Sequence, residues 1–144
     1  MKRKERTRVL VDGDRELLSR MAHEAEQRFA VAVVKEPAEE LVMLKMREDA
    51  QRSLFYLGEA LMTSCTVRIG RVHGYGMVLG DDCDKARDLA VVDAAYVACG
   101  DESLRRGWDA ALAAERQRLD ELMLDHSEAL LRTQVDFSTM EVQG

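Results

Sequence analysis

A sixteen-residue stretch with the periodicity of a β-strand, residues 54–69, lies near the middle of the sequence. One face of it would carry Phe55, Leu57, Glu59, Leu61, Thr63, Cys65, Val67 and Ile69. That face is apolar except at Glu59 and Thr63, as in a strand with one side against a core. Because the stretch is longer than an ordinary strand, we expect a bulge or bend at Gly58. A chain with such a segment must build a sheet around it, since its backbone groups need partners.

Further segments with strand character lie on both sides of this stretch. They are residues 31–34, 41–46 and 72–79. Pro37 separates the first two, a polar turn at residues 47–53 precedes the long stretch, and a turn near Gly70 follows it. Parallel pairs need long crossover connections, so strands joined by such short links run antiparallel. The sequence therefore predicts a four-stranded antiparallel meander.

Helical periodicity returns before and after the strand region. Apolar side chains recur at helical spacing in residues 15–29, directly after Asp14, which suits an N-cap. Alanines line one flank of a second helix that begins after Gly80. A longer helix with one apolar face follows from residue 101, and we expect a short helix at residues 3–10.

The length of the chain fits one domain built from these elements. It has 144 residues, of which 47% are hydrophobic, enough for a core without disulfides or metals. We expect an α+β fold, in which the four-stranded antiparallel meander is packed by an N-terminal helix, an Ala-rich helix and a long C-terminal helix. The single domain spans residues 1–144, and residues 1–14 form a charged N-terminal segment.

The charge of the chain argues against two classes of partner. Its formal net charge is −6, whereas nucleic acids and anionic membranes are bound by basic surfaces. A basic cluster at residues 2–8 is the exception. No apolar run approaches the ~20 residues that span a bilayer, and residues 9–11 are too short for the apolar region of a signal peptide. We therefore expect a cytoplasmic protein that binds neither nucleic acid nor membrane.

Three titratable residues are candidates for acid–base or ligand-binding roles. Glu59 places a carboxylate on an apolar strand face, unless a bulge at Gly58 turns it outward. Asp93 lies on an apolar helix face, where partial burial with a hydrogen bond is the structural alternative. His73 precedes Gly74-Tyr75-Gly76, which suits either the approach of a phosphate or an ordinary strand and turn. None of these residues belongs to a complete catalytic motif, so the residues alone predict no active site.

The other histidines and the cysteines favour structural roles. His23 and Glu26 share a helix face without a second pair of ligands, and His126 lies in the last helix. The cysteines are Cys65, Cys83 and Cys99. Their odd number and wide spacing argue against a disulfide framework and a zinc site, so we expect reduced thiols that pack as small core residues. We expect no metal and no cofactor in this chain.

Three stretches of the chain match a known family in order and spacing. Residues 55–67 hold an aromatic pair followed by Gly-Glu, a Thr and an alternating strand. Residues 74–82 form a Gly-containing strand with a Gly-x-Asp turn, and an alanine-rich helix follows as far as Asp93. Residues 135–140 read Val-Asp-Phe-Ser-Thr-Met. Together they resemble the PhnG subunit family of the bacterial carbon–phosphorus lyase system, over about residues 31–142.

The resemblance implies a role in the use of phosphonates as a phosphorus source. Members of that family assemble with PhnH, PhnI and PhnJ into a core complex. With PhnL, the complex attaches an alkylphosphonate to the ribose C1 of ATP and displaces adenine, which yields α-D-ribose 1-alkylphosphonate 5-triphosphate. PhnI is regarded as the subunit that carries this chemistry. The resemblance therefore implies a supporting subunit, with no catalytic residue to carry over to this chain.

Two functions from different classes follow. An assembly subunit would contact its partners through exposed apolar residues of the long strand and of the tail, unless the tail folds back on its own sheet. The expected contact residues are Phe55, Tyr56, Glu59, Val135, Asp136, Phe137 and Met140. The alternative is a free-standing homo-oligomeric enzyme or binding module with Glu59, His73 and Asp93 around a small acidic pocket. Only the alternative predicts activity or ligand binding by the purified chain alone.

Overall fold

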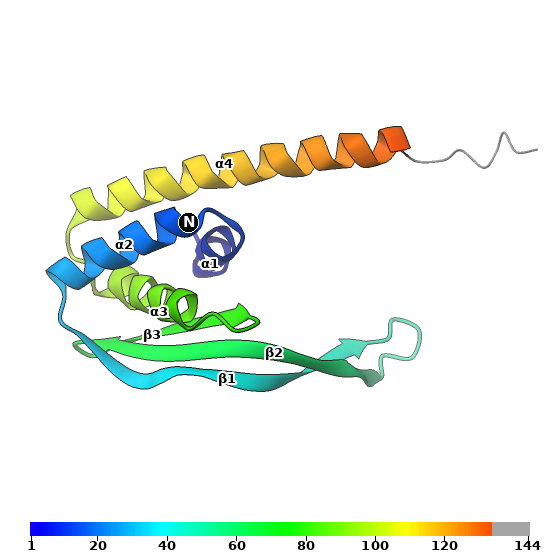
Figure 1. Ribbon diagram of the computed structural model, residues 1–144, viewed down its shortest axis with the longest axis horizontal. Helices are drawn as coiled ribbons and strands as arrows, with labels where there is room; N and C mark the ends of the chain where they lie inside the picture. Colours follow the sequence, from blue (N-terminus) through cyan, green and yellow to red (C-terminus); the bar gives the residue numbers. More distant parts are fainter. Residues whose placement is uncertain (134–144) are drawn as a thin grey trace, which may run out of the picture.

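The computed structural model describes residues 1–133 as four helices and a three-stranded sheet (Figure 1). In chain order the elements are α1 (Arg3–Asp12), α2 (Arg15–Arg28), β1 (Val31–Arg47), β2 (Leu54–Ile69), β3 (Val72–Leu79), α3 (Cys83–Ala98) and α4 (Glu102–Thr133). The strands are antiparallel in the order β1-β2-β3, so each strand pairs with its neighbour in sequence. The predicted α+β class and antiparallel meander are confirmed.

The prediction of four strands was wrong, because the expected strands at residues 31–34 and 41–46 are one. β1 continues through Pro37, and its register with β2 shifts between Lys35 and Ala38. Pro37 therefore lies in an irregularity of an edge strand. There its missing N–H removes no hydrogen bond from the ladder.

The bulge expected at Gly58 is confirmed. Leu44 pairs with Gly58 and Lys45 with Tyr56, which leaves Leu57 as the extra residue in β2. Gly58 has a φ of 150°, a conformation that glycine adopts without steric cost. β2 continues across this bulge as one strand, so the β1–β2 hairpin extends well beyond the end of β3 (Figure 1).

All four helices lie on one side of the sheet (Figure 1). α3 packs on β2 and β3, α1 and α2 pack on α3, and α4 lies on their far side. Because α3 is enclosed between the sheet and the other helices, it is apolar on nearly all sides. Its buried residues are Ala86, Leu89, Ala90, Val91, Val92, Asp93, Ala94, Ala95 and Tyr96.

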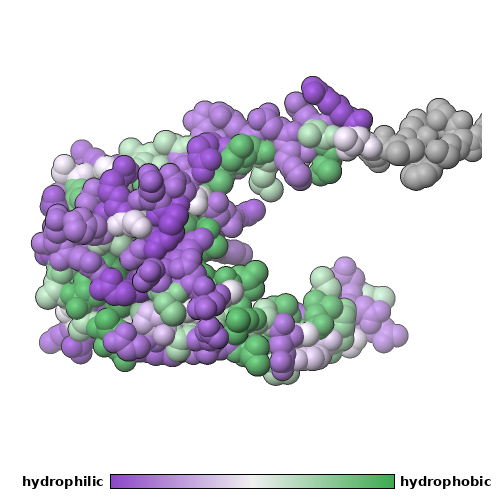
Figure 2. Space-filling view, in the orientation of Figure 1, coloured by the Kyte–Doolittle hydropathy of each residue, from purple (hydrophilic) through white to green (hydrophobic). Residues whose placement is uncertain are grey.

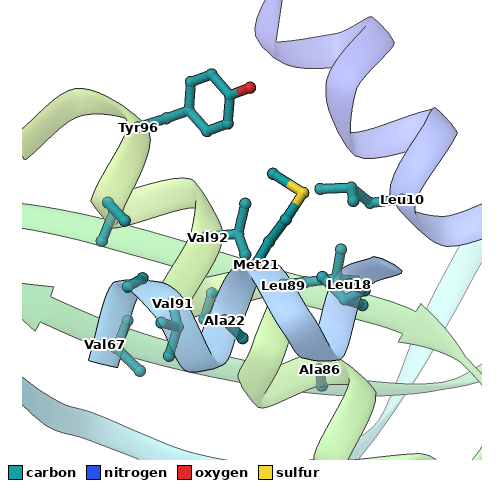
Figure 3. Close-up of a cluster of buried hydrophobic side chains, with 14 of the residues drawn as sticks. Leu10, Leu18, Met21, Ala22, Val67, Ala86, Leu89, Val91, Val92 and Tyr96 are labelled. Carbon is teal, nitrogen blue, oxygen red and sulfur yellow. The ribbon is translucent and has the colours of Figure 1, made fainter. Parts of the chain in front are cut away.

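The core joins α1, α2 and β2 to α3. Leu10, Met21 and Val67 point toward α3 from these three elements (Figure 3). Each buried side chain of this size contributes about 1.5–3 kcal/mol to stability. The indole N–H of Trp108 in α4 donates to Glu24 of α2 at 2.8 Å, which attaches the first half of α4 to the domain.

Glu115 of α4 supports the turn between α1 and α2. Its carboxylate accepts a hydrogen bond from the backbone N–H of Asp14 at 2.7 Å and another from Arg118 Nε at 2.9 Å. The bond from Arg118 is the main reason that the pKa of Glu115 is lowered, and the bond from Asp14 adds to it.

We expect Glu115 to make the protein sensitive to acid. A carboxyl group whose pKa is lowered on folding stabilises the fold above its unfolded pKa, and this contribution is lost as the pH falls through the folded pKa. Urea midpoints measured from about pH 5 to about pH 3 should therefore fall less steeply for Glu115→Gln than for the unaltered chain. Glu128→Gln, on the exposed end of α4, is the matched control. Parallel pH profiles of Glu115→Gln and the unaltered chain would contradict this role.

Candidate functional site

The structure places Glu59, His73 and Asp93 in three separate surroundings. His73 pairs with Arg68 near the β2–β3 turn, whereas Glu59 lies nine residues further back along β2. At ~3.3 Å per residue, Glu59 and His73 are roughly 30 Å apart. Asp93 lies in α3, on the side of the helix that contacts β3. The three residues do not surround a common pocket.

Asp93 is buried, and both of its oxygens are occupied. Oδ1 accepts hydrogen bonds from Arg3 Nε at 2.8 Å and Arg6 Nη2 at 3.1 Å, and Oδ2 accepts one from the backbone N–H of Tyr75 at 3.0 Å. The bond to Asp93 raises the pKa of Arg3. The structural alternative for Asp93, burial with hydrogen bonds, is confirmed. This carboxylate is an anchor that joins α1 and β3 to α3.

The charged N-terminal segment is therefore part of the folded domain. Arg6 is buried, and its guanidinium lies 4.2 Å from the centre of the Tyr96 ring as well as against Asp93. Burial and a hydrogen bond to Asp109 raise the pKa of Tyr96. The spacing of the sequence carried no signal for these contacts, because Arg6 and Asp93 lie 87 residues apart.

Gly74 and Gly76 serve helix packing. A Cβ atom on Gly74 would lie 2.1 Å from the carbonyl oxygen of Ala90, and one on Gly76 would lie 1.9 Å from that of Ala86. The backbone of α3 thus occupies the space in which a phosphate would have to lie. His73 is exposed on the opposite face of β3. The strand-and-turn alternative for this motif is confirmed.

The remaining polar candidates are dispersed. His23 forms a hydrogen bond with Gln27 at 3.0 Å, and residues 1–133 hold no group of three or more possible metal ligands. Cys65 and Cys99 are buried as expected, but Cys83 is exposed because it begins α3 at the rim of the domain. Across the same residues, no helix has both the length and the apolarity needed to cross a membrane.

The hollows between helices are open and lined by paired charges. One of about 540 Å³ lies between α2 and α4, where Arg118 contacts Glu115. Another of about 270 Å³ lies between α1 and α4 and is bordered by Val9, Leu119 and Met123. Glu59, His73 and Asp93 line neither hollow.

The largest unusual surface belongs to two projecting arms. The β1–β2 hairpin continues past the end of β3, and α4 continues past α1 and α2 in the same direction (Figure 1). We call residues 39–61 the hairpin arm and residues 120–133 the helix arm. An open cleft with apolar patches on both walls separates them (Figure 2).

The hairpin arm exposes apolar side chains on both faces. Leu41 pairs with Leu61 on one side of the hairpin. Further along the sheet α3 covers this same side, and Thr63 is buried there. Leu44 and Met46 alternate onto the other side. The apolar residues that are at least 40% exposed are Leu41, Met43, Leu44, Met46, Leu54, Phe55, Tyr56, Leu57 and Leu61.

Glu59 lies on the predicted strand face, yet it is exposed. Glu59 lies on the same side of the sheet as Leu61 and pairs with Met43. The bulge at Leu57 lies closer to the tip of the hairpin, so it does not change the side on which Glu59 lies. Its carboxylate reaches solvent because the hairpin arm has left the cover of α3. Among the other predicted contact residues, Phe55 and Tyr56 are exposed on the same arm. The rest lie outside the described residues: Val135, Asp136, Phe137 and Met140.

Helical periodicity predicts one apolar face along this helix, and it does not distinguish the helix arm from the packed first half. Only Trp108, Leu112 and Glu115 of α4 are buried. The exposed large apolar residues of the arm are Leu122, Met123, Leu124, Leu130 and Leu131, at 50–69%. The length of α4 is the signal that was available. Its 32 residues extend about 48 Å, whereas α2 has 14 residues and α3 has 16.

Comparison with known proteins adds an independent finding. The model of a family described as "Phosphonate metabolism protein PhnG" matches residues 1–144. A curated protein of Rhizobium meliloti (strain 1021), "Alpha-D-ribose 1-methylphosphonate 5-triphosphate synthase subunit PhnG", is 35% identical over 112 residues. The matched region covers 76% of this chain and 69% of that protein. The resemblance seen in the sequence is thereby confirmed.

Proposed function

This chain belongs to the PhnG family of phosphonate metabolism proteins, and we propose that it is a non-catalytic subunit of a carbon–phosphorus lyase core complex. The observation that carries this proposal is the pair of arms, which leave many large apolar side chains at least 40% exposed among residues 1–133. Monomeric proteins rarely leave contiguous apolar patches above a few hundred Å² exposed. The name of the Rhizobium meliloti relative, a synthase subunit, supports the same role.

The proposed complex contains homologues of PhnH, PhnI and PhnJ and acts with PhnL. It transfers an alkylphosphonate to the ribose C1 of ATP with release of adenine, and the product is α-D-ribose 1-alkylphosphonate 5-triphosphate. This chain would hold or shape the catalytic subunit without a reacting group of its own, since Asp93 is engaged by Arg3 and Arg6. Because ATP is the substrate, the proposed complex works in the cytoplasm.

The proposed partner contacts include Phe55, Tyr56 and Glu59. The aromatic pair is exposed near the tip of the hairpin arm, and exposed aromatic residues are common anchors of interfaces. Glu59 adds a charge within an apolar surface, where a cation of the partner would set the register of the contact. The tail residues Val135, Asp136, Phe137 and Met140 are proposed to extend this interface, because they follow the end of the helix arm in sequence.

Co-expression tests the proposal directly. The tagged chain is produced with the PhnH, PhnI and PhnJ homologues of its source organism and analysed by affinity capture and size exclusion. We expect one large species that contains all four chains. If this chain elutes alone while the other three assemble, the proposal is overturned. Turnover or ligand binding by the purified chain alone would instead favour the free-standing enzyme or binding module.

A further inference from the structure

We propose that the hairpin arm and the helix arm are two walls of one binding cleft that holds a basic, two-layered helical segment of a single partner subunit. This inference rests on the proposed function, because it names the kind of partner that the subunit would hold. Three features of the described residues support it: the width of the cleft, the apolar residues on its walls and the charge of both arms.

The layers of the domain determine the width of the cleft. Between the sheet and α4 lie two layers of helix, α3 and then α1 with α2 (Figure 1). Each helix layer adds ~8–10 Å. Both arms continue in line with the sheet and α4 beyond the ends of these inner helices (Figures 1 and 2). The cleft therefore has room for two helix layers, and one strand or one helix would be too thin to contact both walls.

Apolar residues face the cleft from both walls. On the hairpin arm, Leu41 and Met43 lie on the side of the sheet that α3 covers further along. On the helix arm, Met123 borders the hollow between α1 and α4, and Leu130 follows seven residues later on the same helix face.

Charge on the arms distinguishes between possible occupants. The helix arm has four carboxylates and one guanidinium: Asp120, Glu121, Asp125, Glu128 and Arg132. The hairpin arm has five carboxylates and three cations: Glu39, Glu40, Glu48, Asp49, Glu59, Lys45, Arg47 and Arg52. Counted over all their faces, both arms are net acidic, so helices that carry Lys or Arg beside their apolar faces are the complementary occupants. A second copy of this chain, with a net charge of −6, is the less complementary occupant.

Photo-crosslinking in the assembled complex tests whether one occupant contacts both walls. A benzoylphenylalanine side chain is introduced at Met43 in one sample and at Leu130 in another, and the captured peptides are identified by mass spectrometry. We expect both positions to capture the same partner chain, within neighbouring helices rich in Lys or Arg. Capture of different chains by the two arms, or of a second copy of this chain, would overturn the inference.

Affinity measurements on the complex provide a second test with matched controls. Leu41→Thr with Met43→Thr, and Met123→Gln with Leu130→Gln, should each weaken binding by at least ~10-fold. The controls are Leu44→Thr on the other hairpin face, and Leu124→Gln with Leu131→Gln, about 100° around the helix. All seven positions are exposed, so the fold should tolerate each change. Equal losses in the controls would overturn the two-walled cleft.

The two proposals fail in different ways. If the unaltered chain does not assemble with the other subunits, the proposed function falls, and this inference falls with it. If the complex assembles but the two arms capture different chains, only this inference falls. Weaker assembly at high salt would support a basic occupant, because salt screens charges exposed at the rim of an interface.

Discussion

Replacing Asp93 with asparagine is expected to destabilise the protein by about 3–5 kcal/mol, because the buried guanidinium of Arg6 loses its counter-charge. Asp93 and Arg6 are both nearly inaccessible to solvent. Asparagine keeps the size of the side chain, so the loss would report charge and hydrogen bonding rather than a cavity. Urea unfolding followed by circular dichroism measures the free energy of unfolding. Amide exchange in α1 should also accelerate, since Asp93 holds α1 against α3.

Asp88→Asn is the matched control on the same helix. Asp88 forms an ion pair with Arg15 at 2.8 Å, but it is more accessible to solvent than Asp93. Burial raises the pKa of Asp88 despite the hydrogen bond from Arg15, so a neutral amide should cost only about 0–1 kcal/mol there. If Asp93→Asn is no more destabilising than Asp88→Asn, Asp93 is not the anchor of α1.

A double variant keeps this prediction decisive if Asp93→Asn alone fails to fold. Arg6→Met removes the guanidinium and retains an apolar side chain of similar length. With no buried charge left uncompensated, Asp93→Asn combined with Arg6→Met should recover part of the loss, with a coupling of about 1–3 kcal/mol. Additive effects of the two changes would contradict a direct interaction between these side chains.

Gly76→Ala is expected to cost about 3 kcal/mol or more, at the upper end of the losses from overpacking. The added methyl group would lie 1.9 Å from the carbonyl oxygen of Ala86, which belongs to the backbone of α3 and cannot rotate away. The helix would have to lift off β3 and expose part of the core. Thermal and urea unfolding of the purified variant measure the loss, and absence of a cooperative transition would be its extreme form.

Gly107→Ala is the control for Gly76→Ala, because the same substitution is made where there is space for the methyl group. Gly107 lies inside α4, and a Cβ atom there would have no neighbour within 4 Å. Alanine favours a helix over glycine, so this change should stabilise the protein by about 0.5–1 kcal/mol. If Gly76→Ala proves as harmless as Gly107→Ala, close packing of α3 on β3 is not the reason for glycine in this strand.

Local chemistry was sufficient to predict most of the secondary structure. The alternation in residues 54–69 identified the long strand, and Gly58 identified its bulge. Asp14 accepts the N–H of Glu16 as an N-cap, as its position before a helical pattern indicated. These features depend on neighbours within a few residues, which the sequence lists directly. Pro37 misled the prediction because its effect depends on whether its strand lies at an edge, and that is a property of the sheet.

The surroundings of the candidate residues depend on contacts between segments that are far apart in the sequence. Asp93 was expected to be buried with a hydrogen bond, but its partners Arg3 and Arg6 come from the far end of the chain. The glycines of β3 were visible in the sequence, but the helix backbone against them was not. Glu59 was correctly placed on a strand face, yet its exposure follows from where α3 begins, because the helix starts at Cys83 and runs away from the hairpin arm.

The amino-acid sequence was enough to predict the helices, an antiparallel meander, the family and the apolar character of the long strand and the last helix. Which of these apolar side chains enter the core depends on how the elements pack in three dimensions. The reason is physical, because periodicity shows that a face is apolar but not whether another element of the same chain reaches it. In this protein the β1–β2 hairpin and α4 extend beyond the helices between them, so their apolar ends are exposed among residues 1–133.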